Sequence, residues 1–208
     1  TFEISNILSV IRKEIVKYTA DDHISPIFSP ILPPILPEIR RGHYIHGPMT
    51  VLHVLEKYDD KCIRGIFEKE LSCGYTNENM LDNSQSHVAV IHNNCYTDVL
   101  ESINNKKYQI MCLEDCFSAE WPAVIVVHEM RVKEPYDTSL ATLYLAMSRA
   151  RVKCPLLLCP EKGKRFKDCD DRYIQLLDKF KPHAHTMNYL FCENDKEIVK
   201  QVNLADFL

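Results

Sequence analysis

The chain has 208 residues, of which 46% are apolar and 26% are charged, and its formal net charge is −4. This composition is typical of a globular domain with a hydrophobic core and argues against a disordered or fibrous chain. The negative net charge gives no general argument for nucleic-acid binding, although it leaves room for a local basic patch. Because no apolar stretch reaches the ~20 residues of a membrane span, we expect no membrane association.

The nine cysteines are an odd number and include no CxxC pair. Reduced thiols in a protein of the nucleus or cytoplasm are therefore favoured over a disulfide framework, and a zinc site is the less favoured alternative. His43, His46 and His53 would need a further close ligand to bind a metal ion, so we assign no metal site. The opening residues, TFEISNIL, lack the basic and apolar regions of a signal peptide.

The first half of the chain predicts a helix, a connector and a strand–helix unit. Apolar residues at helical spacing predict a helix over residues 3–18. Five prolines interrupt residues 24–40, which we expect to be an extended connector against the core. A disordered linker is the less favoured alternative, because the segment is rich in Ile and Leu. A strand over residues 49–55, a helix over 59–71 and a polar loop over 74–86 follow.

The second half of the chain alternates strands and helices. The predicted strands are residues 87–92, 108–113, 123–129, 152–159 and 186–191, and the predicted helices are residues 96–104, 138–150, 173–180 and 195–204. The apolar runs are continuous rather than alternating, which is typical of a parallel sheet with helices on both faces. The pattern therefore predicts an α/β fold.

Ligands of such sheets bind beyond the carboxyl ends of the strands, and we expect three polar segments to lie there. They are CFSAEWPAVIVV (116–127), LYLAMSRAR (143–151) and VAVIHNNCYTDVLESI (88–103). In the first, Glu120 precedes a buried strand and Pro122 fixes the turn, which places the carboxylate to accept hydrogen bonds from a ligand hydroxyl. For this segment alone, a surface acid is the simpler interpretation.

The second segment places an arginine at the end of a predicted helix. With Leu140 as the centre of the buried face, Leu143, Tyr144 and Met147 lie within about 60° of it at ~100° per residue. Arg149 then points about 180° away from the core. Two interpretations stay open: Arg149 caps the helix end, where a cation is favoured by the dipole, or it reaches a negative group outside the helix.

Taken together and in order, these segments resemble the second RecA-like domain of superfamily 1 helicases of the UvrD/Rep type. HVAVIHNNCYTDVLESIN is similar to the family's strand–turn–helix iAVL-x-R-x-N…LeeaL, CFSAEWPAVIVV to motif V (KGLEFPVVIL), and LYLAMSRARVKCPLLL to motif VI (LYVAMTRARKxLyL). TFEISNILSVI resembles the helix after motif IV. The resemblance covers roughly residues 1–20 and 87–160, and motif VI is its most specific part. HGP is faintly similar to the helicase-like portion of Schlafen-type proteins.

The resemblance implies that ATP binds with Mg²⁺ between two RecA-like domains. An upstream domain of the same chain would supply the phosphate-binding loop and hold most of the metal ion, while this domain supplies an arginine finger. That catalytic role is carried to Arg149, with Ser148 in the family's Ser/Thr position. The ribose-contacting carboxylate of motif V is carried to Glu120, and Arg151 is a further nucleotide-binding candidate. A guanidinium suits this role because its planar fork meets phosphoryl oxygens bidentately.

Motif V departs from the family pattern. Phe117 and Ser118 stand where the family has Lys-Gly, and a glycine there lets the backbone approach a phosphate closely. Leu113 and Glu114 replace the family's upstream Thr or His. The phosphate-binding loop G-x-x-x-x-G-K-[ST] does not occur in the 208 residues. We therefore expect no ATP hydrolysis by this chain alone.

The predicted fold is a RecA-like three-layer α/β sandwich with a mainly parallel sheet, related to P-loop NTPases but without its own phosphate-binding loop. Residues 1–208 would form a single helicase C-terminal domain, with residues 24–40 as the connector and residues 41–86 as an insertion. Since the chain begins with Thr1 rather than Met, we expect it to be a fragment of a longer protein.

The leading hypothesis for function is the second motor domain of an ATP-dependent helicase-like protein that acts on single-stranded DNA or RNA. The alternative is a degenerate domain of the same fold that binds nucleic acid or protein and regulates without hydrolysis, which the motif V departures motivate. An unrelated α/β hydrolase or nucleotide-binding protein is a third hypothesis. The basic residues Lys162, Lys164, Arg165 and Lys167 lie in a run of mixed charge that is either a solvated loop or a phosphate contact.

Overall fold

A computed structural model describes residues 1–21, 47–72, 88–93, 108–116, 119–131 and 133–189. The segments predicted as a connector (24–40), a polar loop (74–86) and two helices (96–104 and 195–204) lie outside these ranges.

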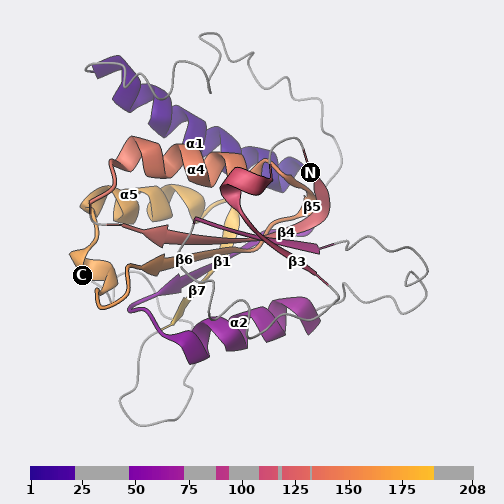
Figure 1. Ribbon diagram of the computed structural model, residues 1–208. Helices are drawn as coiled ribbons and strands as arrows, with labels where there is room; N and C mark the ends of the chain where they lie inside the picture. Colours follow the sequence, from indigo (N-terminus) through magenta and orange to yellow (C-terminus); the bar gives the residue numbers. More distant parts are fainter. Residues whose placement is uncertain (22–46, 73–87, 94–107, 117–118, 132, 190–208) are drawn as a thin grey trace.

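Seven strands form one sheet in the order β3-β2-β4-β6-β1-β7, with β5 beside the first half of β4 (Figure 1). They are β1 (Thr50–Leu55), β2 (Val88–His92), β3 (Gln109–Cys112), β4 (Trp121–Met130), β5 (Ala150–Lys153), β6 (Leu156–Pro160) and β7 (Ala184–Tyr189). Every ladder between these strands is parallel. Residues in the middle of β2, β4 and β6 are buried on both faces, as the continuous apolar runs predict.

Helices cover both faces of this sheet. The helices are α1 (Phe2–Asp21), α2 (Asp60–Ser72), α4 (Tyr136–Met147) and α5 (Asp171–Phe180), with short 3-10 turns η2 (Leu113–Asp115) and η3 (Phe166–Asp168). Apolar residues of α1, α4 and α5 join one core cluster with strand residues such as Leu52 and Val124. Ile63 and Phe67 of α2 join a second cluster on the opposite face (Figure 1).

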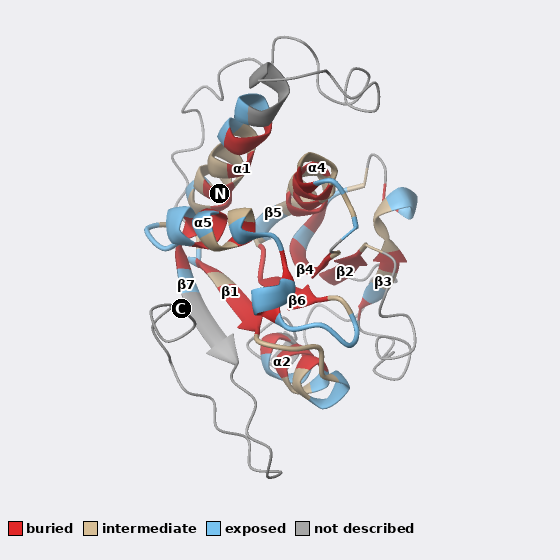
Figure 2. Cartoon of the chain, turned by 90° about the vertical axis from the view of Figure 1, so that its left-hand side faces the viewer, coloured by how far each residue is buried: buried red, intermediate tan, exposed pale blue. Residues whose placement is uncertain are grey.

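The inner face of α1 shows why this sequence forms a helix against the sheet. Ile4, Ile7, Ile11 and Ile15 recur at helical spacing and are each at most 3% exposed. Burying one such side chain stabilises a fold by about 1.5–3 kcal/mol. Buried residues of α1, α4 and α5 lie on the sides that face the interior, and the central strands β4 and β6 between the layers are almost wholly buried (Figure 2).

The structure confirms the architecture expected from the sequence and changes several boundaries. The core is a three-layer α/β sandwich with a mainly parallel sheet, as predicted for a RecA-like domain. The predicted strand 152–159 is two strands, because Pro155 has no N–H group to donate to a ladder. The predicted helix 138–150 begins earlier, after Pro135, and ends at Met147.

Part of the range 41–86, for which we expect an insertion, belongs to the sheet itself. Its strand β1 lies between β6 and β7, with Leu52 paired to Leu156 on one side and Thr186 on the other. Its helix α2 supplies the cover of the second face. The described part of this range is therefore integral to the core. Among the described helices, none combines the length and apolarity that crossing a bilayer requires.

Candidate functional site

Two of the three polar segments singled out in the sequence, those with Glu120 and with Arg149, meet at the amino edge of the sheet. Glu120 directly precedes β4, while Arg149 and Arg151 come between α4 and β6. The expectation that these two segments lie at the carboxyl ends of the strands is therefore wrong. In a parallel sheet the connection that follows a helix returns to the amino edge, so residues just before a strand lie there.

The backbones of the two segments are joined directly. Trp121 N donates a hydrogen bond of 2.9 Å to Arg149 O, and β5 continues the contact by pairing Ala150 with Trp121. This short ladder, whose register shifts between Trp121 and Ala123, holds the main chain next to Glu120 against that next to Arg149. The indole of Trp121 is buried, which agrees with a packing role.

The side chains of Glu120 and Arg151 form an ion pair. Arg151 Nε donates to Glu120 Oε2 at 2.7 Å. The two side chains are 47% and 68% exposed, respectively, so solvent reaches both of them. Two of the predicted nucleotide-binding residues are therefore in contact, and a third predicted residue, Arg149, is tied to the same strand through its carbonyl oxygen.

Arg149 lies just beyond α4 rather than inside it. Its N–H donates to Ala146 O at 3.2 Å, and its side-chain Nε lies 3.4 Å from Leu145 O, in the last turn of α4. In this arrangement the guanidinium caps carbonyl groups at the helix C-terminus, where positive charge is favoured. The capping interpretation thus describes the contact seen here, while partial exposure leaves the outer side of the guanidinium open to solvent.

Ser148 is the residue after the last turn of α4 and keeps helical backbone angles (φ −64°, ψ −14°). Its N–H donates to Tyr144 O at 2.9 Å, and its hydroxyl donates to Leu145 O at 2.7 Å. Both bonds go to carbonyl groups in the last turn of α4, so Ser148 caps the C-terminus of this helix directly before Arg149.

The first helix also reaches this edge. Thr1 N lies 3.1 Å from Arg151 O, and Glu3 Oε2 accepts a 2.7 Å hydrogen bond from Gly47 N. A Cβ at Gly47 would lie 2.5 Å from Thr1 Cγ2, so glycine permits this close approach. The start of α1, the turn before β4 and the turn after α4 therefore converge, although they are far apart in the sequence.

A buried thiol completes the surroundings of Arg149. Cys116 Sγ lies 2.9 Å from Leu113 O in the crossover between β3 and β4. Burial raises the pKa of this thiol above its usual value, and the nearby positive charge of Arg149 only partly offsets that rise. Cys116 is therefore a neutral packing residue beside the arginine rather than a thiolate.

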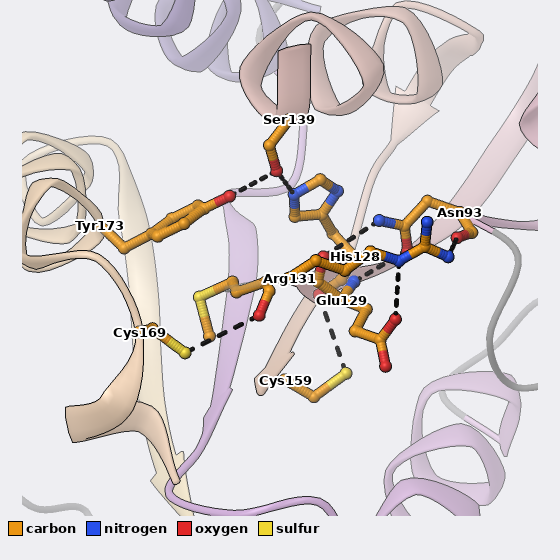
Figure 3. A network of polar contacts seen from close by, with 9 residues as sticks. Asn93, His128, Glu129, Arg131, Ser139, Cys159, Cys169 and Tyr173 are labelled. Carbon is orange, nitrogen blue, oxygen red and sulfur yellow. Dashed lines mark hydrogen bonds and ion pairs between the residues drawn. The ribbon is translucent and has the colours of Figure 1, made fainter. Parts of the chain in front are cut away.

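A second polar cluster lies at the opposite, carboxyl edge, where Asn93 of the third predicted segment is found as expected, whereas its partners at the end of β4 were not predicted (Figure 3). Asn93, after β2, accepts a 2.9 Å hydrogen bond from Glu129 N and donates one of 3.0 Å to Glu129 O. Arg131 donates to Glu129 Oε2 at 3.0 Å and to Asn93 O at 2.8 Å. Through these mutual hydrogen bonds the three side chains bridge the ends of β2 and β4. Ligands of α/β sheets commonly bind at this edge. The signal in the sequence was HEMR at the end of an otherwise apolar strand.

His128, next to Glu129 in β4, forms a buried hydrogen bond with the helical layer. Its Nε2 lies 2.9 Å from Ser139 Oγ of α4, and Ser139 Oγ also bonds Tyr173 OH of α5 (Figure 3). Burial, with a smaller effect from the charge of Arg131, lowers the pKa of His128 to about 3. The imidazole is therefore neutral and fully enclosed, which makes this Ser–His pair a structural tie rather than a nucleophile with its base.

Another buried polar group lies on the α2 face of the sheet. His53 Nε2 and Glu70 Oε1 are 3.0 Å apart, and Lys153 Nζ forms an ion pair with Glu70 Oε2 at 3.2 Å. Burial favours a raised pKa for Glu70, but His53 and then Lys153 outweigh it and lower the pKa. Within the described ranges no group of three or more His, Cys, Asp or Glu side chains is arranged to hold a metal ion.

No protein-family model matches this chain, and no curated protein matches its sequence. Among solved structures it is similar to the C-terminal domain of a possible DNA helicase from Lactobacillus plantarum WCFS1. The identity is 14% and the TM-score is 0.46, over 68% of this chain and 86% of that domain. At this level the likeness is one of coarse chain arrangement only.

Proposed function

We propose that this domain is the second motor domain of an ATP-dependent, superfamily 1 helicase-like protein of the UvrD type. The observation that carries the proposal is the convergence of three segments on one edge of the sheet. The start of α1 resembles the helix after motif IV, the turn with Glu120 resembles motif V, and the turn with Arg149 and Arg151 resembles motif VI. Trp121 N and Arg149 O join the latter two directly.

The groups at this edge suit one half of a nucleotide site. The guanidinium of Arg149 supplies positive charge for phosphates, Glu120 supplies an acceptor for a hydroxyl, and Arg151 is paired with Glu120. Arg149 would act as the arginine finger by leaving its contact with Leu145 O, a single long bond of 3.4 Å, and turning towards the phosphates. Stabilisation of transition-state charge by such an arginine accelerates related hydrolases by ~10³–10⁵.

The other half of the site would come from an upstream RecA-like domain of the same protein. That domain would provide the phosphate-binding loop, which the 208 residues lack, and would hold most of the Mg²⁺. Closure of the two domains on ATP would move a single strand of DNA or RNA across them.

The proposal is tested by ATP hydrolysis in the full-length protein, with and without single-stranded DNA or RNA. We expect strand-stimulated hydrolysis that depends on Arg149. A second candidate function is a nucleic-acid- or protein-binding module without hydrolysis. The contact of Arg149 with Leu145 O favours it, since this arginine already has a structural role. Absence of hydrolysis together with retained strand or protein binding would support that second function.

A further inference from the structure

The ion pair between Arg151 and Glu120 is too exposed to matter much for folding. With side chains 68% and 47% exposed, such a pair contributes roughly 0–1 kcal/mol to stability. Its geometry is nevertheless well defined, with Arg151 Nε 2.7 Å from Glu120 Oε2. We therefore consider how this contact affects the orientation of the Glu120 carboxylate.

Neighbouring main-chain contacts fix the backbone of Glu120, whereas its side chain is held by Arg151. The hydrogen bond from Trp121 N to Arg149 O and the pairing of Trp121 with Ala150 set the main chain on both sides. Within the described part of the chain, the side chain of Glu120 forms its hydrogen bond with Arg151. A glutamate without it would sample several rotamers, and fixing such a side chain costs about 0.5–1.5 kcal/mol on binding.

The paired carboxylate retains capacity for a ligand. Arg151 occupies one site on Oε2, whereas an ionised carboxylate has about four acceptor sites on its two oxygens. A hydroxyl donor can therefore bind while the ion pair persists. The guanidinium also offsets the negative charge of Glu120, which would otherwise repel the phosphates of an approaching nucleotide.

We infer that Arg151 is a positioning residue that orients Glu120 to accept a hydrogen bond from a ribose hydroxyl, so that the pair favours nucleotides that carry this hydroxyl. This inference rests on the proposed nucleotide site. Arg151 acts through Glu120 and not on the phosphates, so its loss weakens binding of the ribose and leaves the chemical step intact. The expected signature is a change in KM that depends on the sugar, with kcat unchanged.

The test uses the full-length protein with ATP, 2′-deoxy-ATP and 3′-deoxy-ATP as substrates. For Arg151→Ala we expect KM for ATP to rise about three- to tenfold, from the cost of ordering one freed side chain, with kcat within about twofold. KM for the deoxynucleotide that lacks the contacted hydroxyl should not change.

Arg151→Lys should restore part of the loss, and Arg151→Ala should add nothing to Glu120→Gln. Arg64→Ala, an exposed arginine on α2, is the matched control and should behave as wild type.

Two results would overturn the inference while leaving the proposed function intact. In one, Arg149→Ala and Glu120→Gln impair hydrolysis but Arg151→Ala raises KM equally for ATP and both deoxynucleotides, or leaves KM unchanged. In the other, Arg151→Ala lowers kcat, which would place Arg151 on the phosphates. If instead the full-length protein neither hydrolyses ATP nor binds a fluorescent ATP analogue, the proposed function fails and the inference fails with it.

Discussion

His128 is the buried residue whose protonation the fold opposes most clearly. It is 2% exposed, and its pKa is lowered to about 3, against a usual value of 6.5. Between these two pH values the unfolded chain binds more protons than the folded one, so the free energy of unfolding decreases as the pH falls. The stability that a neutral His128 provides is complete above about pH 6.5 and is lost progressively towards pH 3.

We therefore predict acid destabilisation that depends on this one side chain. The contribution is on the order of 4–5 kcal/mol by pH 3, at about 1.4 kcal/mol per pKa unit. Urea unfolding of the 208-residue chain between pH 7.5 and 4, followed by the fluorescence of its only tryptophan, Trp121, would measure it. His128→Gln should be less stable at pH 7.5 but lose stability less steeply on acidification. Equal slopes would show that another group is responsible; burial also lowers the pKa of His92, which acts in the same direction.

Glu70 is the central partner in its buried group, since it meets both His53 and Lys153. Glu70→Ala would leave the ring of His53 and the ammonium of Lys153 without their carboxylate, at a cost of about 2–4 kcal/mol in the free energy of unfolding. Glu68→Ala, on the exposed side of the same helix, is the matched control and should change stability by less than about 0.5 kcal/mol. A similar small effect for both variants in urea denaturation would refute this account of Glu70.

At the scale of elements, Ser139 ties α4 to its neighbours. Its hydroxyl bonds His128 of β4 and Tyr173 of α5, all of them buried. Ser139→Ala should destabilise the domain by about 2–3 kcal/mol, because two buried polar groups lose their partner. Thr142→Ala removes only a bond within α4, to Ser139 O, and should cost less than about 1 kcal/mol. Thermal unfolding of the two variants would measure both losses of stability. Equal losses would argue against a stabilising role for the bonds of Ser139 to His128 and Tyr173.

The sequence predicted the type and order of the described elements well, because their apolar periodicity is strong. Ile4 to Ile15 lie on one helix face, and β2, β4 and β6 are continuous apolar runs. Boundaries were less accurate where backbone chemistry intervenes. Pro155 divides one predicted strand into β5 and β6, and the hydroxyl of Ser148 helps to end α4 three residues before the predicted end.

The structure places Glu120 and Arg149 at the amino edge of the sheet, whereas we expected them at the carboxyl edge. Which edge a segment occupies depends on whether it precedes or follows its strand, and Glu120 and Arg149 both precede one. The pairing of Arg151 with Glu120 could not be predicted, because it depends on the register of β5 against β4. The cluster of Asn93 and Arg131 was missed for a similar reason, since its partners come from different strands.

At the scale of the whole molecule, the two edges of the sheet differ in chemistry. The carboxyl edge between β2 and β4 is bridged by polar side chains that bond one another. The amino edge carries Glu120, Arg149 and Arg151, partly open to solvent. Under the proposed function, the amino edge would face the nucleotide, and an upstream domain would supply the remaining phosphate contacts.

The measurement that tests this account most directly is the ATPase rate of the full-length protein, with single-stranded DNA or RNA, for wild type, Arg149→Ala, Arg149→Lys and the control Arg64→Ala. We predict strand-stimulated hydrolysis that falls at least about 100-fold in both Arg149 variants, because lysine lacks the planar fork, and stays unchanged in the control. Hydrolysis that proceeds at the wild-type rate in Arg149→Ala, or no hydrolysis by the wild type, would contradict the account. Arg149 would then be a helix cap, and the domain a binding module.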